Sequence, residues 1–369
     1  MTNDGPSSGF FVTLYDEDTL NLYLDQGIYG FLMKPEYDNI GKHSRHYAAL
    51  ADYACGRKGT HVFFFLKRKI VYGGQLVGSE RHGCFYMNGP LSPMGIKAGA
   101  ELQWDESQRE CYQRTDREGV FRVKTADGLK ERCQPYLIRF QDDLGFKGRR
   151  VTSDDLYDKL GSFRYPLPSN TIQGMGFCTL TPGECEILLE LYGKTEGSQI
   201  VGSKEDVALT GEPTPFEPEY GISKSSEAKN ESHLEASVAA NPSLFPSRMA
   251  PKGAAICRQV PVSPLKPYQM DRADICYYAS NRIEDGTLPN VVIELKNIKA
   301  GKKEVNQVVR YIEWLKRVVP SKYQDIEFYL YAPDFASNVM NYIPSEFRSQ
   351  MEPVTFDDQE ENDIQLTLS

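Results

Sequence analysis

The sequence predicts a two-domain chain, in which an α+β domain rich in short strands is followed by an α/β domain. The chain has 369 residues, which is enough for more than one hydrophobic core. Short β-rich segments dominate up to residue 193, whereas strand and helix patterns alternate from residue 232 onwards. Between them, residues 194–231 are rich in Gly, Pro, Ser and Glu, which favours a flexible linker. We therefore expect domains at 8–193 and 232–356, with a solvated acidic tail at 357–369.

Composition and charge argue against several classes of protein. The formal net charge is −9, which argues against a protein that coats nucleic acid without specificity. No apolar run is long enough to span a bilayer, and the first residues lack the basic start and apolar stretch of a signal peptide. The eight cysteines form no CxxC pair and show no zinc-ligand spacing. We expect a cytoplasmic protein with reduced thiols.

In the first domain, strands are predicted where aromatic and β-branched residues cluster, and helices where apolar residues recur at helical spacing. Thr181 followed by Glu184 is typical of a helix capping box. Many short strands with few helices favour a small β-barrel with helices. The predicted strands are 10–14, 62–66, 70–77, 119–124 and 136–140, with 62–66 and 70–77 as a hairpin, and the predicted helices are 16–26 and 181–192.

The second domain alternates between the two kinds of pattern. Short apolar runs that predict strands are separated by longer amphipathic stretches that predict helices. This alternation is typical of an α/β core. The predicted helices are 232–240 and 303–317, and the predicted strands are 273–279, 291–296 and 326–332.

A candidate active centre lies at the end of the apolar run 291–293. This run is typical of a buried central strand, and Glu294 and Lys296 follow it on one face because strand side chains alternate. Asp274 lies in a second predicted strand. Two carboxylates from neighbouring strands form an oxygen-ligand site suited to Mg²⁺, and an adjacent ammonium group can offset charge that develops on a phosphate. These residues therefore predict metal-assisted hydrolysis of a phosphodiester.

Parts of this centre also have simpler interpretations. A Glu-x-Lys motif is short, and Glu227-Ala228-Lys229 in the predicted linker satisfies it as well. A surface strand that ends in two charges would explain the motif equally. Glu235 follows Ser232 at the spacing of a capping box, which would give it a structural role, or it faces the metal site from its helix.

The predicted helix 303–317 contributes two further candidates. Gln307 and Tyr311 are four residues apart and share one face of the helix. Basic residues surround them, and a basic surface beside a carboxylate site suits a nucleic-acid backbone. The alternative is that both are ordinary residues of an amphipathic helix. The basic residues are Lys299, Lys302, Lys303, Arg310, Lys316 and Arg317.

Five blocks follow one another in the second domain: His233-Leu234-Glu235, Asn241-Pro242, Arg272-Ala273-Asp274, Glu294-Leu295-Lys296 and Gln307-Val308-Val309-Arg310-Tyr311. In order and spacing, over residues 232–356, they resemble the nuclease domain of the NucS/EndoMS family. The resemblance implies a PD-(D/E)XK α/β nuclease fold with Glu235, Asp274 and Glu294 near a divalent metal ion, Mg²⁺ or Mn²⁺. It gives Lys296 a catalytic role, and the last block would line the same site. It also implies a DNA endonuclease, for which a homodimer is one arrangement. Nothing before the linker resembles that family's own N-terminal domain, so mismatch specificity is not carried over.

The first domain opens with a strand, a polar turn, an amphipathic helix and a Gly-Ile-aromatic sequence at residues 10–31. The hairpin 62–77 contains Gly73-Gly74, and the domain ends in the segments 167–172 and 181–192. This pattern resembles a YTH or EVE domain of the PUA-like superfamily. The resemblance implies a domain that takes a nucleotide flipped from its strand and stacks a modified base between aromatic rings.

On this resemblance, Tyr29 takes the place of a cage aromatic that is usually Trp, and Tyr15 contacts the base. Trp104 is a candidate for a second wall of the cage, along with Tyr86. Packing in the core or exposure on a loop is the alternative for each of these rings. The basic residues are expected to lie on the surface rather than to contact phosphate; they are His43, Arg45 and His46.

Together these features predict a modification-dependent DNA endonuclease of the restriction or phage-defence type. The first domain would recognise a modified base, and the linker would raise the effective concentration of the nuclease domain on the bound DNA. One alternative is a repair or structure-specific endonuclease that cuts mismatches or flaps. Others are a nuclease directed by modified RNA and a binding protein with a degenerate nuclease fold, against which the set Asp274, Glu294 and Lys296 counts.

Overall fold

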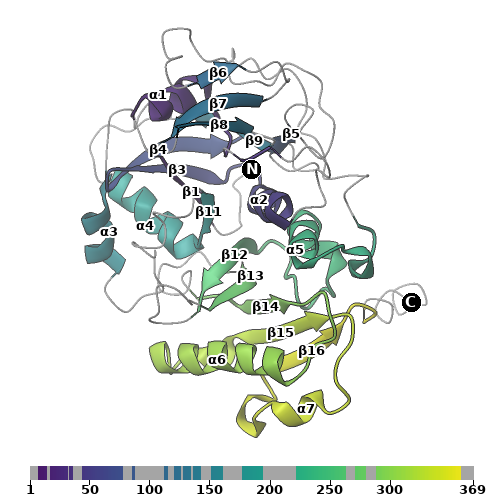
Figure 1. Cartoon of the computed structure of the whole chain (residues 1–369). Coiled ribbons are helices and arrows are strands. Elements are labelled where there is room, and N and C mark those ends of the chain that lie inside the picture. Colours follow the sequence, from purple (N-terminus) through teal and green to yellow (C-terminus); the bar gives the residue numbers. More distant parts are fainter. Residues whose placement is uncertain are drawn as a thin grey trace, which may run out of the picture.

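The computed structural model of the chain describes most of the C-terminal half and a large part of the N-terminal half. Helices α2 (Ser44–Ala54) and α5 (Glu231–Ala240) lie between the N-terminal strands and the C-terminal sheet (Figure 1). The described residues are 7–14, 17–31, 33–35, 44–77, 85–87, 112–114, 120–125, 128–133, 136–142, 151–160, 177–193, 222–262, 271–279 and 288–358.

The described part of the N-terminal half contains many short strands and three further helices. They are β1 (Gly9–Thr13), β2 (Ile28–Tyr29), β3 (His61–Leu66), β4 (Lys69–Leu76), β5 (Phe85–Met87), β6 (Tyr112–Arg114), β7 (Val120–Thr125), β8 (Gly128–Cys133), β9 (Tyr136–Asp142), β10 (Val151–Thr152), β11 (Phe177–Leu180), α1 (Glu17–Gln26), α3 (Ser153–Leu160) and α4 (Pro182–Gly193). The main sheet has the order β11-β1-β3-β4-β9-β2, with β10 on β4 and β5 on β9, and a second sheet has the order β6-β7-β8. Strands β1 and β3 are parallel. Among the described strands no pair joins β11 to β2, so a closed barrel stays a prediction.

The predicted hairpin is confirmed as β3 and β4, which pair antiparallel. Its turn places Lys67 and Arg68 at φ of 49° and 62°, the left-handed conformation that a two-residue turn needs to match the twist of the strands. Gly73 is required by packing, because a Cβ there would lie 2.5 Å from Cε2 of Phe64. The capping box at the start of α4 is also confirmed, since Thr181 N donates to Glu184 Oε2 at 2.8 Å and Glu184 N donates to Thr181 Oγ1 at 3.3 Å.

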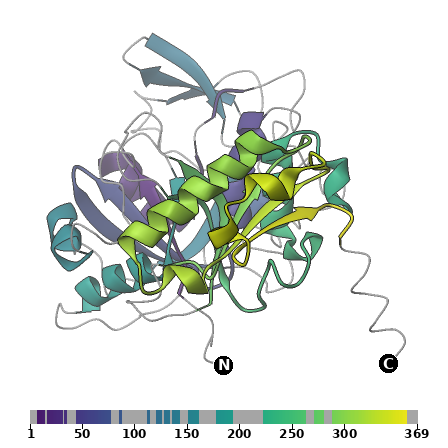
Figure 2. The ribbon, with the colours of Figure 1, turned by 90° about the horizontal axis from the view of Figure 1, so that it is seen from below.

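The C-terminal half is an α/β unit around one five-stranded sheet, as the sequence predicts. Its elements are β12 (Ala255–Pro261), β13 (Arg272–Tyr278), β14 (Val291–Leu295), β15 (Glu327–Ala332), β16 (Met351–Thr355), α6 (Lys302–Val318) and α7 (Val339–Tyr342). The strands follow in the order β12-β13-β14-β15-β16. Strand β13 pairs antiparallel with both β12 and β14, whereas β14, β15 and β16 are parallel. A parallel pair needs a crossover, and α6 supplies it between β14 and β15, lying across one face of the sheet (Figure 2).

Side chains on the two sides of β14 pack in different layers of the fold, because strand side chains alternate. Val292 belongs to the core that includes Val305 and Val308 of α6. Ile293 and Leu295 belong to the core that includes Leu234 of α5. The sequence-based expectation that Leu295 points away from the layer of Glu294 is therefore confirmed, because the even-numbered positions of this strand face α6.

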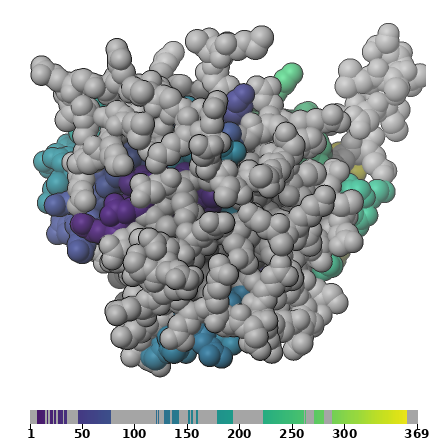
Figure 3. Space-filling model, turned by 90° about the horizontal axis from the view of Figure 1, so that it is seen from above, coloured from purple at the N-terminus to yellow at the C-terminus, as the bar shows by residue number. Residues whose placement is uncertain are grey.

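The two halves of the molecule pack directly against each other. The ring of Tyr47 on α2 stacks on His233 of α5 with ring centroids 4.2 Å apart. Between β11 and β12, Arg258 N donates to Thr179 Oγ1 at 3.0 Å, and that hydroxyl donates back to Arg258 O at 3.3 Å. Arg57 Nη2 donates to the carbonyl of Ala239 at 2.9 Å. Figure 3 views the molecule from the side of the N-terminal half, and residues of the C-terminal half, in green, are visible at the edge of this view.

The end of the predicted linker has a defined structure. Residues 225–227 form a short 3-10 helix, and Tyr331 of β15 donates its hydroxyl hydrogen to Ser225 Oγ at 2.9 Å. The ordered C-terminal half therefore extends upstream of residue 232, at least to residue 222. The rest of the predicted linker, 194–221, lies outside the described residues, as does the acidic tail from residue 359.

Two expectations from composition can be compared with the described residues. The cysteines among them are all free, which confirms reduced thiols at these positions; they are Cys55, Cys133, Cys178, Cys185, Cys257 and Cys276. In the part of the chain that the structure describes, none of the helices has the length and apolarity needed to cross a bilayer.

Candidate active site

The candidate site lies where strands β13 and β14 separate. Their pairing runs from Tyr277–Val291 to Ile275–Ile293 and is not continued beyond that pair. The next residues, Asp274 and Glu294, are 8% and 1% exposed. Leu295 N donates to Asp274 Oδ2 at 2.8 Å, so a side-chain carboxylate takes the place of a ladder partner. The sequence-based prediction of two carboxylates on neighbouring strands is geometrically satisfied here.

Lys296 follows directly after β14 and turns back towards the glutamate. Its Nζ lies 2.6 Å from Glu294 Oε1 and donates to the carbonyl of Leu295 at 2.8 Å. A longer contact of 3.4 Å joins it to Glu231 Oε2 at the start of α5. The backbone is held by Lys296 N, which donates to Tyr331 O at 2.8 Å. Glu294 and Lys296 thus lie side by side, as their spacing on a strand predicts.

Helix α6 places Tyr311 and Gln307 at the same glutamate. The Tyr311 hydroxyl lies 2.9 Å from Glu294 Oε2 and 3.1 Å from the carbonyl of Arg272, either of which can accept its hydrogen. Gln307 Nε2 donates to the Tyr311 hydroxyl at 2.7 Å. Both side chains therefore lie at Glu294, and Tyr311 also belongs to the apolar core that α6 forms with the sheet.

Glu235 does not form the capping box that its spacing from Ser232 suggests. Helix α5 begins one residue earlier, and Asn230 is its N-cap, with Oδ1 accepting from His233 N at 2.9 Å. The Glu235 carboxylate is buried and accepts from Arg258 Nε at 3.0 Å and Nη2 at 2.8 Å. The Glu235 carboxylate therefore points into the interior beside β12 and does not cap helix α5.

Two residues of β12, Arg258 and Gln259, belong to the site although the sequence analysis did not single them out. Gln259 Nε2 donates to Glu235 Oε1 at 3.0 Å and to Asp274 Oδ1 at 3.1 Å, so one amide joins two carboxylates. Successive strand residues normally point to opposite faces. Gln259 has a φ of 52°, and this left-handed conformation interrupts the alternation so that both side chains reach Glu235. The sequence signal was a pair of polar residues, Arg-Gln, inside an apolar run.

Burial and mutual repulsion shape the electrostatics of the cluster. Burial and the charge of Glu294 raise the pKa of Asp274 well above its ordinary value. Burial also raises the pKa of Glu294, although Lys296 and Tyr311 act in the opposite direction. Burial alone would lower the pKa of Lys296, but Glu294 and Asp274 raise it above the ordinary value, so the ammonium form persists. Burial, and then Glu294, raise the pKa of Tyr311, which keeps its proton.

The chemistry of this donor set fits a divalent cation. Asp274 and Glu294 are buried carboxylates that raise the electrostatic cost of each other's ionised form, and a dication between them would relieve that repulsion. Among the described residues, however, no three His, Cys, Asp or Glu side chains are arranged as a ready-made metal cluster. Glu235, the third carboxylate of the site, has its oxygens engaged by Arg258 and Gln259. Asp274 and Glu294 would hold the ion, and Glu235 is the third candidate.

The basic surface predicted around α6 is partly neutralised. Arg310 pairs with both carboxylate oxygens of Asp271 at 2.9 and 3.0 Å, and Lys299 pairs with Asp334 at 2.7 Å. Lys303 and Arg317 are exposed. The surface therefore offers fewer unpaired charges to a nucleic acid than the sequence suggests.

The predicted base-binding residues are described only in part. Tyr29 is 2% exposed and packs in the N-terminal core, edge-on to Tyr23 with ring centroids 5.2 Å apart. This is the core placement that the sequence analysis kept as its alternative. Tyr15 and Trp104 lie outside the described residues, and of Tyr86 only the backbone, in β5, is described.

The expectation that the basic residues near α2 lie on the surface is wrong for His46. That residue is on α2, a helix the sequence analysis did not predict, and it is fully buried with its ring edge-on to Tyr136 at 6.4 Å. The helix buries its inner face against α5 and the N-terminal core, which a single sequence does not reveal. His43 lies outside the described residues, and the side chain of Arg45 is not described.

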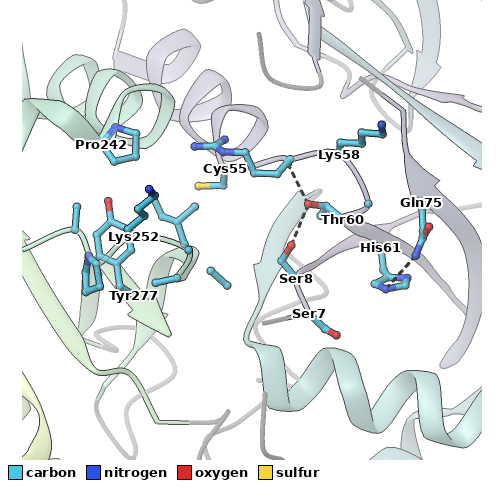
Figure 4. Close-up of a pocket in the computed structure, with 18 residues that line it drawn as sticks. Ser7, Ser8, Cys55, Lys58, Thr60, His61, Gln75, Pro242, Lys252 and Tyr277 are labelled. Atoms are coloured by element: carbon cyan, nitrogen blue, oxygen red, sulfur yellow. Dashed lines mark hydrogen bonds between the residues drawn. The ribbon is translucent and has the colours of Figure 1, made fainter. Parts of the chain in front are cut away.

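A separate cavity of about 650 Å³ lies between the two halves. Polar side chains of both halves face it, including Ser8, Thr60 and His61 on one side and Lys252 and Tyr277 on the other (Figure 4). No carboxylate is among the described residues that line it. It is therefore distinct from the cluster of Asp274 and Glu294 and is not the predicted metal site.

Comparison with known proteins gives structural matches only. No protein-family model and no curated protein matches the chain. The solved structures that align with it include a repair endonuclease from Pyrococcus abyssi, at 12% identity and a TM-score of 0.24, covering 89% of this chain and 98% of that chain. They also include EndoMS in a complex with double-stranded DNA, at 10% identity and a TM-score of 0.22, with the same coverage of 89% and 98%. Neither likeness is close enough to assign a function, so the proposal that follows depends on the side-chain geometry.

Proposed function

We propose that the chain is a divalent-metal-dependent DNA endonuclease. The observation that carries the proposal is the buried cluster of Asp274, Glu294 and Lys296 at the point where two strands separate. Burying two carboxylates beside an ammonium group that keeps its charge costs desolvation free energy during folding. A role in binding a ligand explains why the chain retains them. Perturbed ionisable groups of this kind concentrate at functional sites. Hydrolysis of a phosphodiester uses each of the three groups.

Each side chain has a distinct role in that chemistry. Asp274 and Glu294 would hold the ion, which when bound supplies Lewis-acid polarisation of the scissile phosphate. Lys296 keeps its proton and therefore acts by its charge, offsetting the charge that develops on the phosphoryl oxygens, rather than as a base. Tyr311 binds Glu294 Oε2 and fixes the orientation of that carboxylate, and Gln307 in turn fixes the Tyr311 hydroxyl.

We further propose that the N-terminal half selects the target by a modified base, in a restriction or phage-defence role. The support for this step is the resemblance of residues 10–31, 62–77, 167–172 and 181–192 to YTH and EVE domains. The second candidate is a repair or structure-specific endonuclease. It is favoured by the five sequence blocks of the C-terminal half that resemble the NucS/EndoMS family. A homodimer is compatible with either function.

The two candidates differ in their substrates, so one panel of DNA separates them. The full chain would be incubated in Mg²⁺ or Mn²⁺ with matched plasmids that are unmodified, methylated or hydroxymethylated, and with duplexes that carry a mismatch or a flap. A structured RNA, with and without base methylation, completes the panel. Lys296→Ala serves as the inactive variant for every substrate.

The modified-base proposal expects cleavage confined to one modified plasmid and lost in Lys296→Ala. Cutting of mismatched or flapped duplexes regardless of modification would reject it in favour of repair. Cleavage confined to the methylated RNA would move the substrate class to RNA. If Lys296→Ala cuts as well as the wild-type chain, the assignment of the active site is wrong.

A further inference from the structure

Arg258 of β12 links the candidate metal site to the N-terminal half through a buried ionic chain. Its Nη1 lies 2.5 Å from Asp52 Oδ1 on α2, and its Nη2 lies 2.8 Å from Glu235 Oε2 on α5. The three side chains are 6%, 15% and 7% exposed, in the order Arg258, Asp52 and Glu235. Asp52 and Arg258 are 206 positions apart in the sequence, so the contact exists only because the halves are packed together.

The chain of contacts continues into the centre of the site. Glu235 shares the amide of Gln259 with Asp274, and Asp274 accepts from the backbone of Leu295, next to Glu294. An ion pair that only joined the two halves would not need these further contacts from Glu235 through Gln259 to Asp274. Buried ion pairs are often replaceable by apolar residues with no loss of stability, so stability alone is a weak reason for the arrangement.

We propose that Asp52, from the N-terminal half, is a positioning residue for metal binding at the nuclease site. This inference rests on the proposed function. Asp52 binds the guanidinium of Arg258 at Nη1, whereas Glu235 binds it at Nε and Nη2. Two carboxylates therefore share the charge of Arg258. Glu235 can then turn part of its carboxylate to an ion held by Asp274 and Glu294. The nuclease site is therefore completed by the half of the chain that precedes the linker.

The charge of the cluster supports this role. When fully ionised, as metal binding requires, its groups are the carboxylates of Asp52, Glu231, Glu235, Asp274 and Glu294 and the cations Arg258, Arg272 and Lys296. Their net charge is −2, which one divalent cation neutralises. Without the Asp52 carboxylate the net charge is −1, and Arg258 pairs with Glu235 alone. Both changes weaken the attraction for a dication.

The test is Mn²⁺ binding to the full chain, measured by isothermal titration calorimetry without DNA. Asp52→Asn should bind Mn²⁺ up to about 10-fold more weakly than the wild-type chain, because losing the direct outer partner of a ligand costs about 10–100-fold and Asp52 acts on Glu235 one step further out, through Arg258. Asp52→Glu, which restores the carboxylate, should recover most of the affinity. The matched control is Asp154→Asn, which removes the same charge from an exposed pair with Arg68; it should leave the affinity unchanged.

A second readout separates positioning from a purely structural role. In Asp52→Asn the Mg²⁺ concentration for half-maximal cleavage should rise while the rate at saturating Mg²⁺ recovers, whereas a structural defect would lower the rate at every concentration. Equal Mn²⁺ affinity in Asp52→Asn and the wild-type chain would overturn the inference and leave the proposed function standing. Absence of both Mn²⁺ binding and cleavage in the wild-type chain would overturn the proposed function itself.

Folding is checked by circular dichroism for each variant. Asp52→Ser is the second variant if Asp52→Asn does not fold, because a smaller side chain leaves room for water beside the guanidinium. Weaker Mn²⁺ binding by folded Asp52→Ser would support the inference equally. Failure of both variants to fold would assign Asp52 to stability and overturn it.

Discussion

The two faces of the C-terminal sheet contribute to the candidate site in different ways. On one face, helix α6 is the next long element after β14. It places the Tyr311 hydroxyl at Glu294, which lies 17 positions earlier in the sequence. On the other face, Arg258 joins Glu235 to Asp52, a residue of the N-terminal half. The first face therefore depends on local connectivity, and the second depends on how the halves pack.

This difference indicates that the candidate site is not contained in the C-terminal half alone. Contacts on the α6 face would persist in an isolated C-terminal half, because both partners belong to it. Contacts on the α5 face would lose Asp52, and the buried Arg258 would lose one of its two carboxylate partners. The predictions below test the two faces separately.

The largest effect is expected from breaking the α5 face at its centre. Arg258→Ala leaves Asp52 and Glu235 buried without their cation, which should lower the free energy of unfolding by about 3–5 kcal/mol. The matched variant on the α6 side is Arg310→Ala, which removes an exposed pair with Asp271 and should cost about 0–1 kcal/mol. Urea denaturation of both variants measures the difference. Equal losses would show that the two faces do not differ in this way.

Loss of the ammonium group should affect the chemistry more than the fold. Lys296→Ala should lower the single-turnover rate of DNA cleavage by about 10²–10³-fold, the usual effect of removing one group that stabilises transition-state charge. Lys159→Ala, which removes a lysine paired with Glu190 on the distant helix α4, is the control and should cleave at the wild-type rate. A similar rate in both variants would exclude Lys296 from the reaction.

A smaller effect is expected from the α6 face. Tyr311→Phe removes the hydrogen bond to the Glu294 carboxylate and should lower the free energy of unfolding by about 1–3 kcal/mol. Tyr342→Phe removes an exposed hydroxyl that accepts from Asn338 Nδ2 at 2.8 Å, and it should change stability by less than about 0.5 kcal/mol. Thermal unfolding of the two variants, side by side, decides whether the hydroxyl of Tyr311 has more than a packing role.

The last effect concerns a buried carboxylate that lies on neither face, and it appears only as a change of stability with pH. Burial raises the pKa of Glu184 to about 7, so the folded state binds this proton more tightly than the unfolded state. Its contribution to stability is present at low pH and is lost as the pH rises through about 7. Glu184→Gln keeps an acceptor for Thr181 N but has no proton to lose. Its melting temperature should therefore rise relative to wild type between acid and neutral pH, whereas a constant difference would show that Glu184 does not titrate in this range.

How much the sequence could predict differs between the same regions. The strand 291–296, the helix 303–317 and the pairing of Glu294 with Lys296 follow from alternation and helical spacing, because each relation is local, whereas the resemblance to a nuclease family implied the place of Tyr311. Asp274 was predicted from its strand, although its bond to Leu295 N depends on where β13 and β14 separate. Local patterns and this resemblance were together sufficient for the α6 face.

The α5 face could not be predicted in this way. Gln259 reaches its partners through a left-handed backbone conformation that no residue type announces, since most non-glycine residues avoid it. Asp52 lies on α2, a helix that was not predicted, and its partner is distant in the sequence. Such contacts follow from the packing of the halves, which single-sequence patterns do not encode.

The most direct test of the central claim is cleavage, by the full chain, of the substrate that the panel of modified, mismatched and flapped DNA selects, followed in Mg²⁺ with and without EDTA. The panel would include the wild-type chain, Glu294→Gln and the control Glu352→Gln, whose carboxylate pairs with Arg248 at an exposed position of β16. The structure predicts cleavage by wild type and by Glu352→Gln, abolished by EDTA in both, and none by Glu294→Gln. Cleavage that persists in EDTA, or in folded Glu294→Gln, would contradict a metal-dependent site at these carboxylates.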